Sequence, residues 1–466
     1  MFSYMKRGPH FYKQVAALAA PIILQNLITN MLAMADTFMV GMLGEAPMAA
    51  VTLANIPLFV VQLFIFGMQS GSSVLHSQYW GKQDLKAINR VMGVSMWFVF
   101  LVTSLVAAIL LIWPVEFLSL FGNDPEVVRL AADYGRIAGL SFIFDGIVMQ
   151  YVAAYRCMEK PQLGMYILAA SMVVNTGLNW IFIFGHLGAP AMGVAGAALA
   201  TLISRMLELV IVLFHTHFTR EFRVEWKQVL CPGRDMLRRF VRYGGPVSMD
   251  ETMWGLGSSV FPTIMGHMAN STEILAAFTI AGNVDKLCMV FSFGLAATAT
   301  TIIGREVGAG RPEDVRPVGM ALDTLAVGTG LIVGAALFLF ARFAAPVWLF
   351  PLFKMSSGAS VVAVMMLTTQ ACVRPIRDFN SVNIVGVLRG GGDVKMATII
   401  DIVPLWLVAI PAAFLCGIVL KSNITVVYLM MQLEQLVKCG FGVRRVRSDG
   451  WIRDLTQPSL QKERSK

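Results

Sequence analysis

Asp36 is the side chain whose position most directly indicates chemistry. It lies in the otherwise apolar stretch of residues 31–40. A carboxylate at membrane depth costs at least about 2.5 kcal/mol on insertion scales, so it is expected to have a function. Loss of hydration favours a bound proton, whereas surrounding carboxamide and hydroxyl oxygens would favour a sodium ion. We predict a cation site at Asp36, with a structural polar contact near the outer helix end as the alternative.

A second group of polar residues lies in the segment 359–388. Arg374 and Asp378 are four positions apart, so they share one face of a helix. Asp378 is therefore either neutralised by a local ion pair or free to bind a cation, and the sequence leaves both open. Asn380 and Asn383 would offer further oxygens.

Other charged residues in apolar segments are secondary candidates. Asp285 and Lys286 are adjacent, so they point in different directions on a helix, and Arg377 lies close to Asp378. We expect structural ion pairs at two helical spacings, Arg205 with Glu208 and Glu434 with Lys438. Asp145 and Asp401 receive no role. The six cysteines are scattered without CxxC spacing, which indicates neither disulfides nor a zinc site.

The elements that position these residues are apolar helices. Of the 466 residues 56% are hydrophobic and 14% are charged, against about 25% charged in a soluble domain. Runs of about 20 apolar residues, enough to cross a bilayer, recur along the chain. We predict an all-α membrane protein with twelve spans near residues 14–40, 47–76, 91–113, 131–155, 163–185, 191–215, 238–266, 273–303, 317–341, 359–388, 396–420 and 422–442.

The basic residues alternate by loop. Most of the 37 lysines and arginines lie at the two termini, in the segment 216–237 and in every second loop between spans. The positive-inside rule then places both termini in the cytoplasm of a multi-pass protein of the cell membrane. This pattern explains the net charge of +9 without a nucleic acid, and we expect the basic tail to meet anionic lipid headgroups.

The two halves of the chain repeat each other. Six residues of the first half recur at one constant offset in the second: Ala49, Ala50, Thr52, Ala54, Gly67 and Gly81 return as Ala276, Ala277, Thr279, Ala281, Gly294 and Gly308. Each unit holds six spans, so the repeats enter the membrane in the same orientation. Such a pair encloses a central cleft, as in an alternating-access transporter, although a channel or membrane enzyme could use the same scaffold.

A series of short motifs then resembles one transporter family. They are Pro21 with Gln25, Asp36 with Val40-Gly41 and Gly44, Ala49-Ala50-Val51-Thr52, Gly81-Lys82, Asn175 and Asn179 before Phe184-Gly185, Gly193 with Gly196-Ala197-Ala198, Glu251 before Trp254, and the run from Val387 to Asp393. In this order and spacing the chain resembles the multidrug and toxic compound extrusion (MATE) family of cation-coupled antiporters. The resemblance covers essentially the whole chain.

The resemblance implies two six-helix lobes arranged as a V around a substrate cleft. The lobes would be residues 1–215 and 238–443, joined by the cytoplasmic linker 216–237 and followed by the basic tail 444–466.

The resemblance also implies two ion sites. In the first lobe, Asp36 would join Asn175, Asn179 and Thr201. Some relatives carry a second acid where Asn179 stands, so this departure leaves the choice between Na⁺ and H⁺ open. In the second lobe, Glu251 and Asp378 would bind cations or substrate.

The expected function is cation-coupled efflux of lipophilic, cationic small molecules by alternating access. The 29 methionines and 30 phenylalanines suit such substrates, although both residues also face lipid. A flippase for lipid-linked precursors, supported by Arg374 and Arg377, is the alternative. No nucleophile–base pair or HExxH motif indicates an enzyme. We expect a monomer without a cofactor other than the coupling Na⁺ or H⁺.

Overall fold

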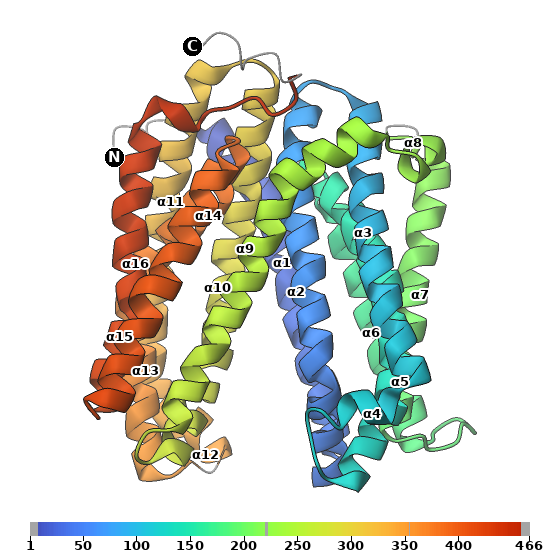
Figure 1. Cartoon of the computed structure of the whole chain (residues 1–466), viewed down its shortest axis with the longest axis vertical. Helices are drawn as coiled ribbons and strands as arrows, with labels where there is room; N and C mark the ends of the chain where they lie inside the picture. Colours follow the sequence, from blue (N-terminus) through green and yellow to red (C-terminus); the bar gives the residue numbers. More distant parts are fainter. Residues whose placement is uncertain (1–7, 220–221, 354, 458–466) are drawn as a thin grey trace. The chain divides into compact units, whose positions relative to one another are not determined.

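The computed structural model describes residues 8–219, 222–353 and 355–457, and within these ranges the chain is helical without strands (Figure 1). The long elements of the first half are α1 (Pro9–Gly41), α2 (Glu45–Gly81), α3 (Leu85–Ile112), α5 (Pro125–Cys157), α6 (Gln162–Phe184) and α7 (Val194–Phe218), with the short α4 (Pro114–Leu118) and α8 (Trp226–Leu230) between them.

The second half begins with α9 (Arg234–Gly266), α10 (Ser271–Gly308) and α11 (Pro312–Leu339). Several of its helices continue as π-helical turns. They form the runs α11–η2–α12 (η2 Phe340–Leu349, α12 Phe350–Leu352), α13–η3 (Ser357–Asn380, Ser381–Leu388), α14–η4–α15–η5 (Val394–Pro404, Leu405–Ala409, Ile410–Phe414, Leu415–Val419) and α16 (Ile424–Arg447) with the 3₁₀ turn η6 (Asp449–Trp451).

Every span predicted from the sequence coincides with one helix or one such run. Among the described residues, ten helices are long and apolar enough to cross a membrane by themselves. The other two, α9 and α16, have 33 and 24 residues and are long enough, but they carry more charged side chains. A helix of that kind is stable in a membrane only when its charges are paired inside the protein.

The chain packs as two compact units, one of residues 24–248 and one of residues 1–23 together with 249–466. The division falls inside α1 and inside α9. The predicted lobe boundaries follow whole helices instead, and they stay a prediction.

The unit of residues 24–248 has α5 at its centre, where it packs against α2, α3 and α7. Small residues make the helices approach closely, as is typical in membranes. Ala50 and Ala54 of α2 lie in one buried cluster with Ala131 and Ala132 of α5. In Figure 1 the short helices α4 and α8 mark opposite ends of this unit.

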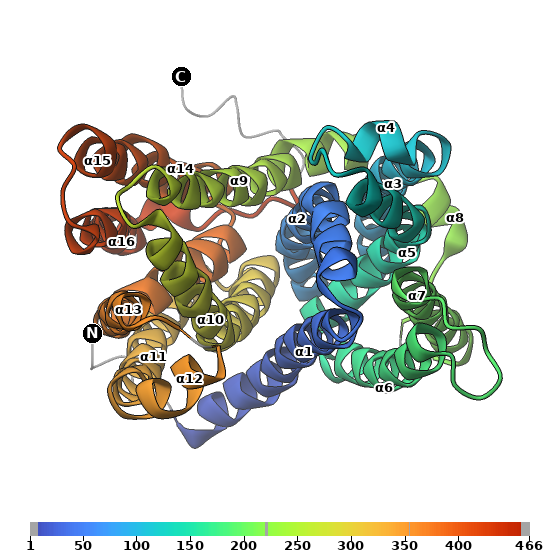
Figure 2. The ribbon, with the colours of Figure 1, turned by 90° about the horizontal axis from the view of Figure 1, so that it is seen from below.

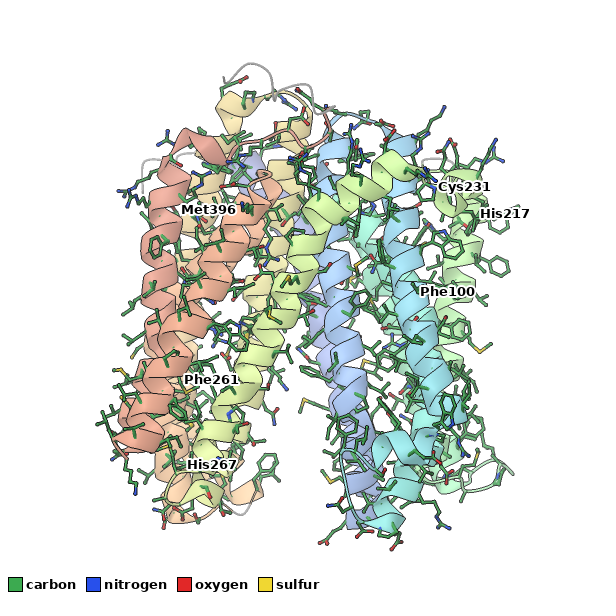
Figure 3. The ribbon with its side chains drawn as sticks, viewed as in Figure 1. Phe100, His217, Cys231, Phe261, His267 and Met396 are labelled. Carbon is green, nitrogen blue, oxygen red and sulfur yellow. The ribbon has the colours of Figure 1, made fainter. Side chains whose placement is uncertain are left out.

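In the other unit α10 packs against α11, α13 and η3, and Figure 2 shows α10, α11 and α13 adjoining in a view along the helices. One apolar cluster of this unit includes Phe261 of α9, which is labelled in Figure 3, together with Ala277 and Met366.

The chain after α16 is packed against this same unit. The Trp451 side chain is fully buried, and a Cβ on Gly391 would lie 2.3 Å from its ring, so only glycine fits there. Arg445 and Arg453 form ion pairs with Asp393, at 2.6 and 3.3 Å. This part of the predicted basic tail is therefore bound to the protein, while residues 458–466 of that tail lie outside the described residues.

Candidate functional site

The four residues predicted for the first ion site lie together in the unit of residues 24–248. Asn179 Nδ2 donates to Asp36 Oδ1 at 2.6 Å and also to Asn175 Oδ1 at 3.0 Å. Asn175 Nδ2 in turn donates to the Thr201 hydroxyl at 3.4 Å. Asp36 of α1 and Thr201 of α7 thus contact two amides of α6. Asn175 and Asn179 are four residues apart, so both amides lie on one face of that helix.

The two asparagines of this hydrogen-bonded set are buried, and the aspartate is partly exposed. Asn175 and Asn179 are 1% and 0% exposed, whereas Asp36 is half-buried. Within the described part of the chain, Asn179 Oδ1 has no hydrogen-bond partner. A buried acceptor without a donor normally costs free energy, so this oxygen has unused capacity to accept a hydrogen bond or a cation.

A second charged group lies near Asp36 in the same unit. Arg205 of α7 forms ion pairs with Glu208 at 2.7 Å and with Asp145 of α5 at 3.2 Å. The first of these pairs was predicted from spacing, and it is confirmed. Arg205 also attracts Asp36 electrostatically. The positive charge of Arg205 is already paired with Glu208 and Asp145. It therefore neutralises little of the negative charge of Asp36.

In the other unit, Asp378 is ion-paired. Arg374 Nε lies 2.8 Å from Asp378 Oδ1, and Ser292 Oγ donates to the same oxygen at 2.5 Å. Of the two states that the sequence left open, the structure contains the local ion pair. Asn380 does not approach this carboxylate, because its amide donates to the Gln435 backbone carbonyl at 2.8 Å.

The secondary candidate Asp285 is part of the same cluster. It accepts from Arg374 Nη1 at 2.9 Å and lies 2.7 Å from Arg377 Nη1. Two carboxylates therefore face two guanidinium groups, and the cluster is balanced in charge. Lys286 is exposed.

Glu251 belongs to a different and larger cluster. Arg389, which follows η3, donates from Nη1 to Glu251 Oε1 and from Nη2 to Asp250 Oδ2, both at 2.6 Å. Arg389 Nη2 also lies 3.6 Å from Asp401 of α14. Lys438 of α16 extends the set, because it pairs with Asp401 at 2.8 Å and with Glu434 at 3.3 Å.

The cluster around Glu251 has more acids than bases. It joins the carboxylates of Asp250, Glu251, Asp401 and Glu434 to the two cations Arg389 and Lys438. Burying uncompensated carboxylates is costly, so the excess favours uptake of a proton or another cation. No three His, Cys, Asp or Glu side chains in the described ranges are arranged to hold a metal ion.

The sequence alone does not reveal most of this cluster. No sequence pattern assigns a role to Asp250 or Asp401, and Arg389 stands out only as part of the motif at residues 387–393. The pair of Glu434 with Lys438 was predicted from its spacing and is confirmed. Spacing along one helix cannot show, however, that α9, α14 and α16 converge on Arg389.

The model of the MatE family matches residues 21–181 and 251–415, which is more than half of the chain. A Bradyrhizobium diazoefficiens protein named "Probable multidrug resistance protein NorM" is 27% identical over 452 residues, covering 94% of this chain and 93% of that protein. A protein of the same name from Thermotoga maritima is 25% identical, covering 87% of this chain and 86% of its own.

Solved structures share the fold. An outward-facing multidrug resistance MATE family transporter matches with a TM-score of 0.84 at 19% identity, covering 98% of each chain. A MATE transporter from Vibrio cholerae matches with a TM-score of 0.83 at 17% identity, covering 93% of this chain and 95% of the other. The all-helical, two-lobe fold predicted from the sequence is thus confirmed. The chain is a multi-pass membrane protein that belongs to the MATE family of transporters.

Proposed function

We propose that this transporter exports lipophilic, cationic small molecules in exchange for an inward flow of Na⁺ or H⁺, and that it acts as a monomer. The names of its relatives, "multidrug resistance protein", support export of small molecules. The observation that carries the coupling is the contact between Asp36 and Asn179, which leaves a single carboxylate in an apolar span beside a buried amide oxygen without a donor.

The geometry supports reversible binding of a proton or a sodium ion at the Asp36 carboxylate. The carboxylate is stabilised by one strong hydrogen bond from Asn179, so it can exist ionised and bind a cation. A proton would bind directly to the carboxylate. A sodium ion would use Asp36 together with the amide oxygens of Asn175 and Asn179 and the hydroxyl of Thr201, all of which are ligands that hard cations accept.

Coupling requires that the ion shift the balance between inward-open and outward-open states. An ion can do so only by its differential affinity for the two states. Asp36 is suited to this role because α1 supplies its carboxylate and α6 and α7 supply the other oxygens. A displacement between these helices would break or complete the site.

The orientation that we propose places both termini in the cytoplasm. In the unit of residues 24–248, Lys82 and Lys160 follow α2 and α5, and Lys227 lies in α8. The turns after α2 and α5 and the short helix α8 all lie at the upper end of this unit in Figure 1. The positive-inside rule makes that end cytoplasmic.

The flippase alternative has lost its support. It rested on Arg374 and Arg377 as free cations for phosphate, but both guanidinium groups are paired with Asp285 or Asp378. The matched relatives also do not favour it.

The test is transport by purified protein in proteoliposomes. Uptake or efflux of ethidium and tetraphenylphosphonium would be followed under a pH gradient, under a sodium gradient and with neither. We expect movement of at least one dye against its gradient in the first or second condition. Equal rates in all three conditions would contradict coupled antiport.

A further inference from the structure

Asp323 is a buried acid that the proposed ion sites do not use. It lies on α11 and is 1% exposed. Its Oδ2 accepts a hydrogen bond of 2.8 Å from Asn383 Nδ2, on the π-helical segment η3. Within the described residues, Asp323 Oδ1 and Asn383 Oδ1 are both buried without a hydrogen-bond partner.

The surroundings of this pair are closed. Gly442 of α16 lies so near that a Cβ there would be 2.8 Å from Asn383 Oδ1. The carboxylate therefore meets one amide donor and otherwise packed side chains. Keeping a buried carboxylate ionised with a single hydrogen-bond donor costs free energy.

The charged groups on the neighbouring elements are engaged elsewhere. The ion pairs of the described residues do not include Asp323. They join Arg374 of α13 to Asp285 and Asp378, Arg305 of α10 and Arg311 to Glu306, Lys438 of α16 to Asp401 and Glu434, and Arg389 after η3 to Asp250 and Glu251. Arg342 of η2 is exposed. The thiol of Cys439 on α16 interacts electrostatically with Asp323.

A bound proton resolves this arrangement. A proton on Oδ1 would neutralise the carboxyl group and leave Oδ2 as acceptor for Asn383, so that no net charge is buried. The partner amide belongs to a π-helical segment of eight residues, and such segments are strained relative to an α-helix and frequent at functional sites. Conversion of η3 to α-helical geometry would turn Asn383 relative to Asp323.

We propose that Asp323 is a proton-binding residue of the transport cycle, protonated in this conformation and deprotonated when η3 changes geometry. In that step the O–H bond at Oδ1 breaks, its electron pair stays on the carboxylate and the proton passes to water. The proposal rests on the proposed antiport and adds to it the identity of one coupling ion.

The first test is infrared spectroscopy of purified full-length protein titrated with base. The carbonyl band of a protonated carboxylic acid should be present at neutral pH and should lose intensity in Asp323→Asn. Asp314→Asn, the same chemical change at an exposed position of α11, should keep the band. A spectrum of Asp323→Asn identical to wild type would overturn the proposal.

A second variant guards against a folding defect in the first. Asn383→Ala removes the donor that stabilises the ionised carboxylate, so the band should persist to a pH about one unit higher. A titration midpoint that does not move in Asn383→Ala would also contradict the assignment.

The role in transport is tested in proteoliposomes with ethidium. Wild type and Asp314→Asn should transport faster as an imposed pH gradient grows, and Asp323→Asn should lose this dependence. Retention of the wild-type pH dependence in Asp323→Asn would make the acid structural and overturn the proposal. Wild-type transport driven by sodium alone would overturn it too, although antiport would stand. Equal wild-type rates under a pH gradient, under a sodium gradient and with neither would also overturn the proposed function.

Discussion

Arg389 donates a hydrogen bond of 2.6 Å to Glu251 across 138 positions of sequence. Glu251 has no basic residue within four positions, and from sequence this made it look solitary. Its partner instead comes from the end of η3. Any cation bound at Glu251 must therefore compete with a guanidinium group that is itself buried.

Arg389→Met should strongly destabilise the protein. Arg389 and Asp250 are 1% and 0% exposed in their side chains, and removing one member of a buried pair costs about 3–5 kcal/mol. Thermal unfolding in detergent would measure the loss. Arg444→Met, at an exposed position of α16, is the matched control. Adding Asp250→Asn should restore part of the stability, because it removes the carboxylate that Arg389→Met leaves unpaired. If stability does not recover, the loss does not come from that unpaired charge.

Glu251→Gln should weaken binding of cationic dyes much more than that of neutral ones. The substitution reduces the acids of the cluster from four to three while both bases remain, so less negative charge is available for a cation or proton. Binding to purified protein would be measured from pH 5.5 to 8.5, where the variant should show a flatter profile. Equal affinities across this range would show that Glu251 serves only the ion pair with Arg389.

Asp36→Asn should abolish coupled efflux while abundance in the membrane stays near normal, because an amide costs less in hydrocarbon than a carboxylate. Proteoliposome transport and membrane yield would be measured side by side. Glu45→Gln, an exposed acid at the start of α2, should transport like wild type. Export by Asp36→Asn at the wild-type rate would remove the first ion site from the mechanism.

Asn179→Ala should reduce coupled efflux by about tenfold, since a hydrogen bond to a charged group contributes about 1.5–3 kcal/mol. The lost contact is the 2.6 Å bond to Asp36. Thr176→Ala changes an exposed residue of the same helix and should have little effect. A similar decrease in both variants would point to damage of α6 rather than to the ion site.

Cysteine labelling can decide the orientation. In a background without the exposed Cys231 and Cys372, a cysteine at Ser271 should react with an impermeant reagent in intact cells. A cysteine at Glu225 should react only after permeabilisation, because it lies in the basic segment between α7 and α9. The reverse pattern would place both termini outside the cell.

Trp451→Ala should lower stability by about 3–5 kcal/mol, because it empties a fully buried aromatic site. Trp348→Ala removes the same side chain from a position that is 80% exposed and should have a small effect. Thermal unfolding of both variants would be compared. Equal shifts would mean that the chain after α16 contributes little to the stability of its unit.

The sequence determined the features that depend on local pattern. Apolar runs of membrane length predicted ten of the long helices in the described ranges, and the recurrence of residues such as Gly67 as Gly294 predicted the repeat. Asp36 could be identified as a candidate functional residue from the sequence alone. A carboxylate in an apolar span costs free energy whichever residues surround it in the fold. Pairs at helical spacing, such as Arg205 with Glu208, were predictable for the same local reason.

Only the tertiary structure decided which distant groups meet. Asp378 forms its local pair, but Arg374 also reaches Asp285 on another helix, and Asn380 turns to Gln435 of α16 instead of toward Asp378. The acid-rich cluster joins α9, α14, α16 and the end of η3. Spacing along one helix fixes which side chains share a face, but the helix that covers that face is set by packing between segments far apart in the chain. The charge state of Glu251 and Asp323 therefore follows from the fold and not from their neighbours in sequence.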